Sequence, residues 1–258
     1  MHGMKRFLPL GLVLSALCWA GCGTTPKPQA AHHEAAHWTY EGHTGPAQWA
    51  GLSDENIACG GVHQSPIDLA DAEPARKALE FIYQPTPLNL VNNGHTIQQD
   101  VVPGSQLRVG TDTYALKQFH MHTPSEHTVE GKAYAMELHL VHRNDAGQLA
   151  VVGVLFERGA TNAFLETFWR HLPAASNDRH SDPSVQLDIR GLLPASSACF
   201  AYEGSLTTPP CTEGVRWLVL ETPVQLAPAQ LDAFRAIYAH NARPVQPRND
   251  RAISRFEP

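Results

Sequence analysis

The stretch that most constrains this chain runs from residue 118 to residue 141 and reads QFHMHTPSEHTVEGKAYAMELHLV. Side chains alternate between the two faces of a strand, so a strand at its start places Gln118, His120 and His122 on one face. A strand at its end places Glu137 and His139 on one face in the same way. Because the glycine-containing connection is short, we expect the two strands to pair antiparallel and to bring the three histidines together.

Three neutral imidazoles on adjacent strands are the ligand set of a catalytic zinc ion, which leaves a fourth position open for water. Structural zinc sites are closed by four ligands, and the chain has no CxxC motif to close one. Gln118 and Glu137 each stand two positions before a histidine, where they can accept the second ring N–H of a ligand. The alternative is three unligated strand histidines. The pattern favours His120, His122 and His139 as ligands of Zn²⁺.

The same stretch resembles the metal-binding core of the α-class carbonic anhydrases. Other segments match the family in its own order, from His37 to about Asn249: HWTYEG, QSPIDL, NNGH, GSLTTPPC and NARPVQPRN. The resemblance, to bacterial exported members, implies a mainly β fold with short peripheral helices. It implies one large, twisted, mostly antiparallel sheet with a conical cleft that reaches the metal. The implied reaction is the reversible hydration of CO2 to bicarbonate and a proton by a zinc-bound hydroxide.

The resemblance also implies roles for four polar residues. His95 matches the proton shuttle, and an imidazole with a pKa near 6.5 can exchange protons near neutral pH. Thr207 and Glu126 match a relay in which the hydroxyl accepts from the hydroxide and gives its own proton to the carboxylate. Thr208 lies beside the bound product. From the residues alone, His95 is predicted to lie in a surface turn and Glu126 to be an exposed acidic residue of a loop.

A hydrophobic wall beside the metal is expected to receive CO2, which has few hydrogen-bonding handles. The residues that match this wall in the family are Val141, Val151, Leu206, Val215 and Trp217. The backbone carbonyl of Asn241 is expected to orient His122. Tyr40 and Asn92 match polar residues that organise the water of the cleft.

Two positions depart from the cytosolic animal enzymes. Thr123 replaces a Trp and Glu203 replaces a Pro, which affects the expected cleft shape and rate but not the reaction.

Two other functions stay open. One alternative is an inactive carbonic anhydrase-like binding domain, although such domains usually lose a ligand histidine. The other is a zinc-scavenging lipoprotein that uses a His-rich tether.

The first 36 residues read as targeting and linker sequence. Lys5 and Arg6 precede an apolar run typical of a signal peptide, assigned to residues 1–21. Cys22 follows a lipoprotein-like cleavage box and is the expected lipidated residue, whereas a cut after Ala20 would release a soluble protein. Residues 22–36 are expected to form a flexible tether and residues 37–258 the catalytic domain. The expected location is the periplasm or cell envelope, with the lipid on Cys22 as the expected link to the membrane.

Three cysteines remain in the mature domain after Cys18 and Cys22 are set aside, which is enough for one disulfide. Spacing alone does not choose the pair, but the resemblance implies Cys59–Cys211. The unpaired Cys199 is expected to be buried. The formal charge of −6 and the lack of basic clusters argue against nucleic acid as a partner. The expected partner is CO2 or bicarbonate, and the oligomeric state is left open.

The remaining sequence predicts short strands separated by Gly, Pro and Asn. They are expected at Leu88–Val91, Thr96–Val102, Gln106–Val109, Thr113–Met121, Ala133–Val141, Ala150–Phe156 and Val215–Leu220. Apolar residues at helical spacing predict two helices, Ala163–His171 and Pro228–His240.

Overall fold

The computed structural model describes residues 37–257 of the 258. They belong to the second of two compact units, Ala35–Pro258. The predicted signal peptide, Cys22 and the tether lie outside the described residues. Within the described range no helix is long and apolar enough to cross a bilayer.

Within residues 37–257, thirteen strands form one large mixed sheet, and three others form a small second sheet. The large sheet contains β2 (Glu73–Ala75), β3 (Leu79–Ile82), β4 (Thr86–Asn92), β5 (Ile97–Asp100), β6 (Gln106–Val109), β7 (Asp112–His122), β10 (Met136–Arg143), β11 (Leu149–Arg158), β12 (Arg179–Leu187), β13 (Cys199–Ser205), β14 (Glu213–Leu220), β15 (Val224–Leu226) and β16 (Ser254–Phe256). The small sheet contains β1 (Asp68–Leu69), β8 (Thr128–Val129) and β9 (Lys132–Ala133).

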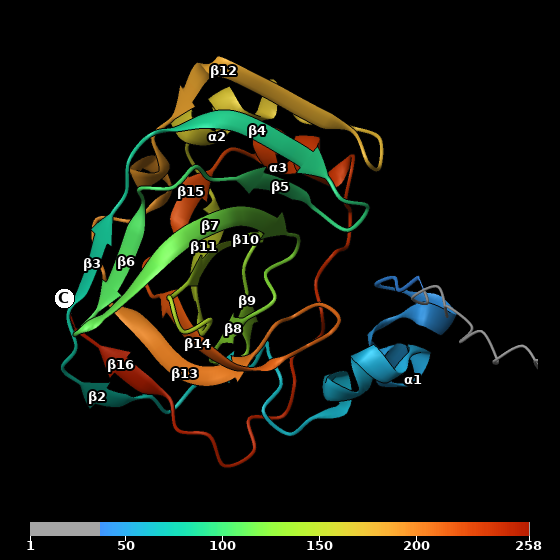
Figure 1. Ribbon diagram of the computed structural model, residues 1–258, viewed down its shortest axis with the longest axis vertical. Coiled ribbons are helices and arrows are strands. Elements are labelled where there is room, and N and C mark those ends of the chain that lie inside the picture. Colours follow the sequence, from blue (N-terminus) through green and yellow to red (C-terminus); the bar gives the residue numbers. More distant parts are fainter. Residues whose placement is uncertain (1–36, 258) are drawn as a thin grey trace, which may run out of the picture. The chain divides into compact units, whose positions relative to one another are not determined.

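The main path of the large sheet is β12-β4-β5-β7-β10-β11-β14-β13-β16-β2. Most neighbours pair antiparallel, whereas β11 pairs parallel with β14 and β15, and β16 with β2. The sheet twists strongly along this path (Figure 1). The predicted fold class, a mainly β domain with one large twisted sheet and short helices, is therefore confirmed.

The helices are short. The α-helices are α1 (Trp49–Leu52), α2 (Ala163–Trp169) and α3 (Pro228–Arg235), and 3₁₀ turns occupy Gly42–Thr44, Pro46–Gln48, Asp54–Gly60 and Ile189–Leu192. Asn162 caps α2 by accepting the N–H of Leu165 at 3.0 Å. Helix α3 starts at a proline and buries Leu231 and Phe234. Both helices pack against the main hydrophobic core of the sheet.

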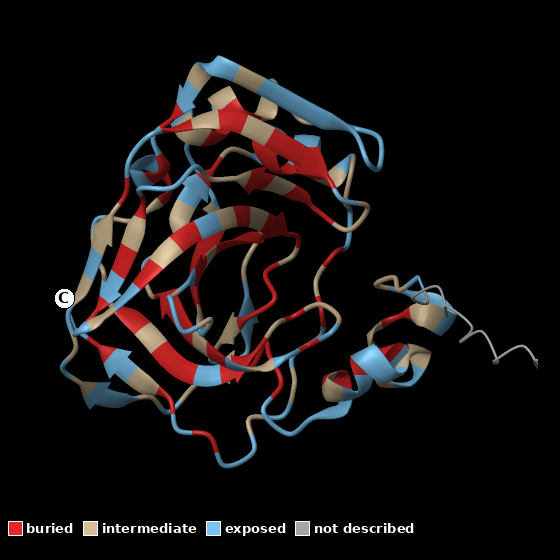
Figure 2. Ribbon diagram, in the orientation of Figure 1, coloured by how far each residue is buried: buried red, intermediate tan, exposed pale blue. Residues whose placement is uncertain are grey.

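Strand β10 and the end of β7 are largely buried near the middle of the sheet (Figure 2). On one face Phe119 and Met121 of β7, with Leu138 and Leu140 of β10, belong to the main core. The side-chain period of two therefore sends the histidines of both strands to the opposite face. This apolar packing sets the register that the site needs, because a slip of one residue would exchange the two faces.

One predicted strand is interrupted, and one predicted helix ends earlier than expected. The predicted strand Ala133–Val141 is interrupted at Tyr134, whose backbone N–H and C=O bond to the Ser125 hydroxyl and N–H instead of a neighbouring strand. The helix predicted to reach His240 stops at Arg235. There the chain turns away, and the carbonyl of Tyr238 accepts the hydroxyl of Thr123 at 3.1 Å. Long-range hydrogen bonds override the local pattern in both places.

Candidate metal centre and active-site cleft

Antiparallel pairing of β7 and β10 brings the three predicted ligands together. His120 lies directly opposite His139, and His122 lies opposite Glu137. The ring centroids of His120, His122 and His139 are 4.6–5.3 Å apart. Each ring offers a nitrogen within 4.8 Å of the others, so the cluster can hold a metal ion.

In His120 and His122, a hydrogen bond at one ring nitrogen leaves the other nitrogen free to bind a metal ion. His120 donates its Nδ1–H to Gln118 Oε1 at 2.8 Å. His122 donates its Nδ1–H to the backbone carbonyl of Asn241 at 2.7 Å. Both acceptors can only accept, so each ring carries its proton at Nδ1 and leaves the Nε2 lone pair free. Nε2 of His122 is buried and has no hydrogen-bond partner among residues 37–257. Buried polar atoms are usually paired, so this atom fits the role of a metal ligand.

Glu137 sets the opposite tautomer in the third ring. Its Oε1 accepts Nε2–H of His139 at 3.0 Å, which leaves Nδ1 of His139 free. The same oxygen accepts Nδ1–H of His127 at 2.7 Å, and Oε2 accepts the backbone N–H groups of Glu126 and His127 at 2.9 and 2.8 Å. Gly153 on β11 makes room for this carboxylate, since a Cβ there would lie 2.9 Å from Oε1.

Electrostatics favour neutral ligand rings and an ionised orienting group. Burial lowers the pKa of His120 and His139 and lowers that of His122 to about 4. Burial also raises the pKa of Glu137, but its attraction to and hydrogen bonds with His127 and His139 outweigh this and hold the pKa well below 4.5. At neutral pH the three rings therefore keep the lone pairs that metal binding requires.

Asn241 connects the metal ligands to the rest of the cleft. Besides its carbonyl bond to His122, its side chain accepts the N–H of Thr123 at 2.8 Å. It donates to the carbonyls of Met121 and His95 at 2.9 and 3.0 Å. Thr123, one of the two departures, does not line the cleft but anchors the segment that carries Asn241. This residue therefore acts on the orientation of His122, not on the cleft wall.

A cleft of about 110 Å³ opens onto two of the ligands. It is lined by Trp38, Tyr40, Asn93, His95, Thr96, Gln98, Gln118, His120, His122 and Thr208. The imidazole of His95 stacks on Trp38 with a centroid separation of 3.6 Å and an interplanar angle of 9°. Burial, followed by the nearby His37, lowers the pKa of His95 to about 4 in this position. The buried hydroxyl of Tyr40 has no partner among the described residues and faces the same space.

The prediction that Asn92 organises the cleft water is wrong. Asn92 is buried at the end of β4, and its amide donates to the carbonyls of Pro173 and Ala174 and accepts from Tyr238. Asn93, the next residue, lines the cleft instead. Its side chain also accepts the backbone N–H of His95 at 3.0 Å and so shapes the turn. The physical reason is that β4 ends at Asn92, so the following turn, not the strand, sets the direction of Asn93.

Glu126 lies beside two of the ligands, 3.5 Å from His122 Nδ1 and 3.9 Å from His139 Nε2, and Thr207 is its neighbour. Glu126 is fully buried, and its Oε1 accepts the backbone N–H of Arg243 at 2.8 Å. Burial raises the pKa of Glu126 to about 7, against the pull of His139, the Arg243 N–H and the Thr207 hydroxyl. The Thr207 hydroxyl is close enough to lower this pKa, but Oε2 of Glu126 has no hydrogen-bond partner within the described residues.

The five residues of the predicted wall gather in one hydrophobic cluster. Val151, Val215 and Trp217 are buried in it, and Val141 and Leu206 pack against it. Val141, Val151 and Trp217 are direct neighbours across β10, β11 and β14. The Trp217 ring lies 4.8 Å from that of His139, so the cluster borders the metal centre.

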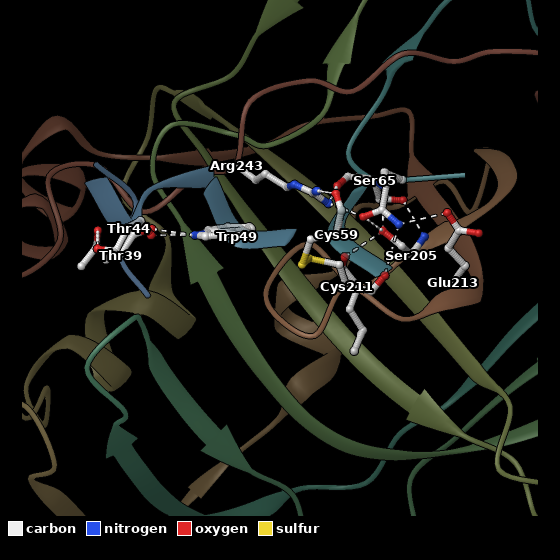
Figure 3. Close-up of a disulfide and its surroundings, with 11 residues drawn as sticks. Thr39, Thr44, Trp49, Cys59, Ser65, Ser205, Cys211, Glu213 and Arg243 are labelled. Atoms are coloured by element: carbon white, nitrogen blue, oxygen red, sulfur yellow. Dashed lines mark hydrogen bonds between the residues drawn. A yellow bond between two sulfur atoms is a disulfide. The ribbon is translucent and has the colours of Figure 1, made fainter. Parts of the chain in front are cut away.

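The predicted disulfide Cys59–Cys211 is present, and Figure 3 shows the network around it. The guanidinium of Arg243 donates to the carbonyls of Cys59 and Ser65 at 3.0 and 2.8 Å. Ser65 and Ser205 exchange two hydrogen bonds of 2.9 and 3.0 Å. These contacts tie the N-terminal segment to the loop that carries Thr207 and Thr208. Cys199 is buried and unpaired, as predicted.

Sequence reasoning missed several residues that hold this site. His127 bridges Glu137 and Tyr202, and the Tyr202 hydroxyl donates to Ser65 at 2.8 Å. The sequence motif NARP contains Arg243 but did not predict its hydrogen bonds to the N-terminal segment. No local pattern marks these residues, because their partners are distant in sequence. The second departure, Glu203, is exposed and lies 3.6 Å from Arg216, outside the cleft.

Fold and site together define a mainly β protein with a three-histidine cluster that can hold a metal ion at the base of a polar cleft. Residues 44–257 match the family model of the eukaryotic-type carbonic anhydrases. The chain belongs to this α-carbonic anhydrase family and is therefore an enzyme of the class that hydrates CO2.

Relatives and solved structures agree with this assignment. The chain is 41% identical to the carbonic anhydrase of a Nostoc species, covering 95% of this chain and 94% of the relative. It is 40% identical to that of Neisseria gonorrhoeae, with 98% and 99% covered. Among solved structures, the α-carbonic anhydrase of Thermovibrio ammonificans in complex with the inhibitor sulfanilamide is 43% identical. It superimposes with a TM-score of 0.82 over 85% of this chain and 99% of that chain.

Proposed function

We propose that this enzyme catalyses the zinc-dependent, reversible hydration of CO2, with His95 as the proton shuttle. The observation that carries the proposal is the set of free lone pairs on His120 Nε2, His122 Nε2 and His139 Nδ1, each defined by a hydrogen bond to the other ring nitrogen. Three neutral nitrogen donors without a fourth protein ligand fit a catalytic Zn²⁺ site. The unpartnered, buried Nε2 of His122 is the test of that fit.

The chemistry that bound zinc supplies is a water pKa near 7, a value established for carbonic anhydrase itself, which makes a nucleophile available at neutral pH. The protein supplies orientation. Oε2 of Glu126 is buried and has no partner among the described residues, and the Thr207 hydroxyl is the neighbouring donor that can bond to it. When the Thr207 hydroxyl donates to this carboxylate, its oxygen can only accept from the nucleophile, which directs a lone pair at the substrate.

The hydrophobic cluster next to His139 supports a site for CO2. An apolar wall of Val141, Val151 and Trp217 excludes water from the reacting carbon and offers no competing hydrogen bonds. Thr208 lines the cleft and can donate to the product oxygen as charge develops on it. The product, bicarbonate, is polar and leaves through the polar side of the cleft.

His95 is proposed to carry the proton between the cleft and solvent. It lines the same cleft as His120 and His122, so waters can bridge it to the metal centre. In the stacked position its lowered pKa, about 4, favours release of a proton to buffer. Uptake of a proton near pH 7 requires a more solvated ring position, in which the pKa returns towards 6.5.

A stopped-flow assay of CO2 hydration on the purified enzyme, with and without a zinc chelator, tests this function. His139→Ala is expected to remove zinc and activity together. His95→Ala is expected to reduce turnover only in weak buffer, because concentrated buffer replaces the shuttle. Unchanged turnover of His95→Ala at low buffer would refute the shuttle, and full activity after complete zinc removal would refute the metal site.

We further propose that the enzyme acts outside the cytoplasm, in the periplasm or cell envelope, with Cys22 as a lipid tether. The Cys59–Cys211 disulfide supports this location, because disulfides persist in oxidising compartments. Mass spectrometry of the mature protein tests the anchor. A diacylated N-terminal Cys22 is the expected result, and an unmodified chain that starts at residue 21 would refute it.

A further inference from the structure

A second pocket, of about 330 Å³, lies outside the cleft and shares no lining residue with it. It is formed by β9 and the residues after it, the end of β11, and helix α3. Its lining residues are Lys132, Ala133, Tyr134, Ala135, Glu157, Arg158 and Arg235. Three of the seven are cationic and one is acidic, although the chain as a whole has a formal charge of −6. The pocket is therefore a local concentration of positive charge.

The three cations form no ion pair in the described structure. No carboxylate of residues 37–257 lies within 4.0 Å of Lys132, Arg158 or Arg235. Other arginines of the domain do have such partners, for example Arg108 and Arg190, whose carboxylates lie at 2.9 and 2.7 Å. The donors of the pocket are thus available to an external anion.

Arg235 provides an independent sign of a missing ligand. Its Nε is one of five buried side-chain polar atoms without a hydrogen-bond partner in residues 37–257. Three of the others are Tyr40 Oη, His122 Nε2 and Glu126 Oε2, all at the catalytic centre, where water, metal and substrate bind. The remaining one is Nε of Arg243, whose guanidinium lies over the Trp49 ring. Buried donors are rarely left unpaired, so the N–H of Arg235 points to a second ligand site.

The side chains around Arg235 suit a multiply charged oxyanion. The Lys132 ammonium lies 4.8 Å from the centre of the Tyr134 ring, which restrains it at the pocket. Two guanidinium groups and an ammonium, set against the single carboxylate of Glu157, leave a net charge of about +2. Guanidinium groups match the oxygen spacing of phosphate through paired N–H donors.

We propose that this pocket binds a phosphate group, with Arg158 and Arg235 as the principal donors and Lys132 as a supporting charge. The site is separate from the hydration reaction, and its ligand is a phosphate group either as the free inorganic ion or as part of an anionic lipid headgroup.

The test compares Arg158→Gln/Arg235→Gln with a matched control, Arg143→Gln/Arg179→Gln. The control removes two exposed strand-end arginines that also have no carboxylate within 4.0 Å. Isothermal titration of the zinc-loaded enzymes with inorganic phosphate is expected to show binding at the pocket in the wild type and the control. In R158Q/R235Q the Kd is expected to rise about tenfold or more, equivalent to about 1.4 kcal/mol. Any phosphate bound at zinc is common to all three proteins and cancels.

A second arm measures co-sedimentation with vesicles that contain phosphatidylglycerol, compared with vesicles of phosphatidylcholine alone. Pocket-dependent binding to inorganic phosphate assigns the free ion, and pocket-dependent binding to the anionic vesicles alone assigns the headgroup. The proposal is overturned if neither probe binds, or if R158Q/R235Q and R143Q/R179Q lose binding equally. Circular dichroism and CO2 hydration, both expected to be unchanged in the two variants, establish that loss of binding is not loss of folding.

Discussion

Replacement of Glu137 by Gln tests how the buried carboxylate orients the metal site. Each oxygen of Glu137 accepts two hydrogen bonds: Oε1 from His127 and His139, and Oε2 from two backbone N–H groups. A Gln amide must place its NH2 group against one of these donor pairs. The backbone pair cannot change its protonation, so the amide is expected to face the two rings. His139 then has to accept at Nε2 and carry its proton at Nδ1, the atom needed for zinc.

The size of the effect follows from the bond to His139. A hydrogen bond to a charged group contributes about 1.5–3 kcal/mol, so its loss is expected to lower zinc affinity about 10–100-fold. Replacement of groups that orient zinc ligands lowers metal affinity over the same range, which was established in part on carbonic anhydrases themselves. Turnover of the fully zinc-loaded variant should fall less than zinc affinity does, because the cleft and His95 are untouched.

Zinc affinity is measured by competition with a chromophoric chelator at constant pH, with circular dichroism as the check on folding. Gln118→Glu is the matched control. It keeps an acceptor 2.8 Å from Nδ1 of His120, so no comparable loss of zinc affinity is expected. Equal zinc affinity in Glu137→Gln and the wild type would refute the tautomer argument, as would an equal loss in both variants.

Three further predictions concern stability and are measured by urea unfolding at fixed zinc concentration. Cys59→Ser/Cys211→Ser opens a loop of sequence separation 152, and is expected to cost up to about 5 kcal/mol by loop entropy; a loss below about 1 kcal/mol would contradict it. Burial lowers the pKa of His142 from 6.5 to about 3. Below pH 6.5 this ring is therefore protonated in the unfolded state but neutral in the folded state, so the free energy of unfolding decreases as the pH drops. Between pH 7.5 and pH 5 the wild type should lose about 2 kcal/mol more than His142→Gln, and parallel profiles would refute this. In Gly204→Ala a Cβ would lie 2.1 Å from Ser65 Oγ, which predicts a loss of about 1–3 kcal/mol, and wild-type stability would contradict it.

Local patterns were enough to predict the core of the sheet and two of the helices. Alternation in residues 118–122 separated the metal-facing histidines from Phe119 and Met121, and the antiparallel register of β7 with β10 agrees with it. Proline at the start of α3 and helical spacing of its apolar residues placed that helix. These signals are readable in sequence because they depend on neighbours a few residues apart. The short edge strands have no such signal, since their partners lie far along the chain.

The family resemblance supplied expectations that spacing alone did not, and one was displaced by a residue. It predicted the Cys59–Cys211 bond, which is present. It placed Asn92 in the cleft, whereas the turn after β4 buries Asn92 and presents Asn93. A motif match fixes a segment, but the face on which each side chain lies depends on where the strand ends.

Periodicity in the chain determined which residue types could meet a metal, and tertiary structure decided which of their atoms are free to do so. His122 is oriented by a carbonyl 119 residues away, and Arg243 reaches Ser65 across 178 residues. The basic pocket joins side chains of β9, β11 and α3 that no sequence window contains. The physical reason is that tautomers, burial and charge depend on contacts in space, and folding alone brings those distant groups together.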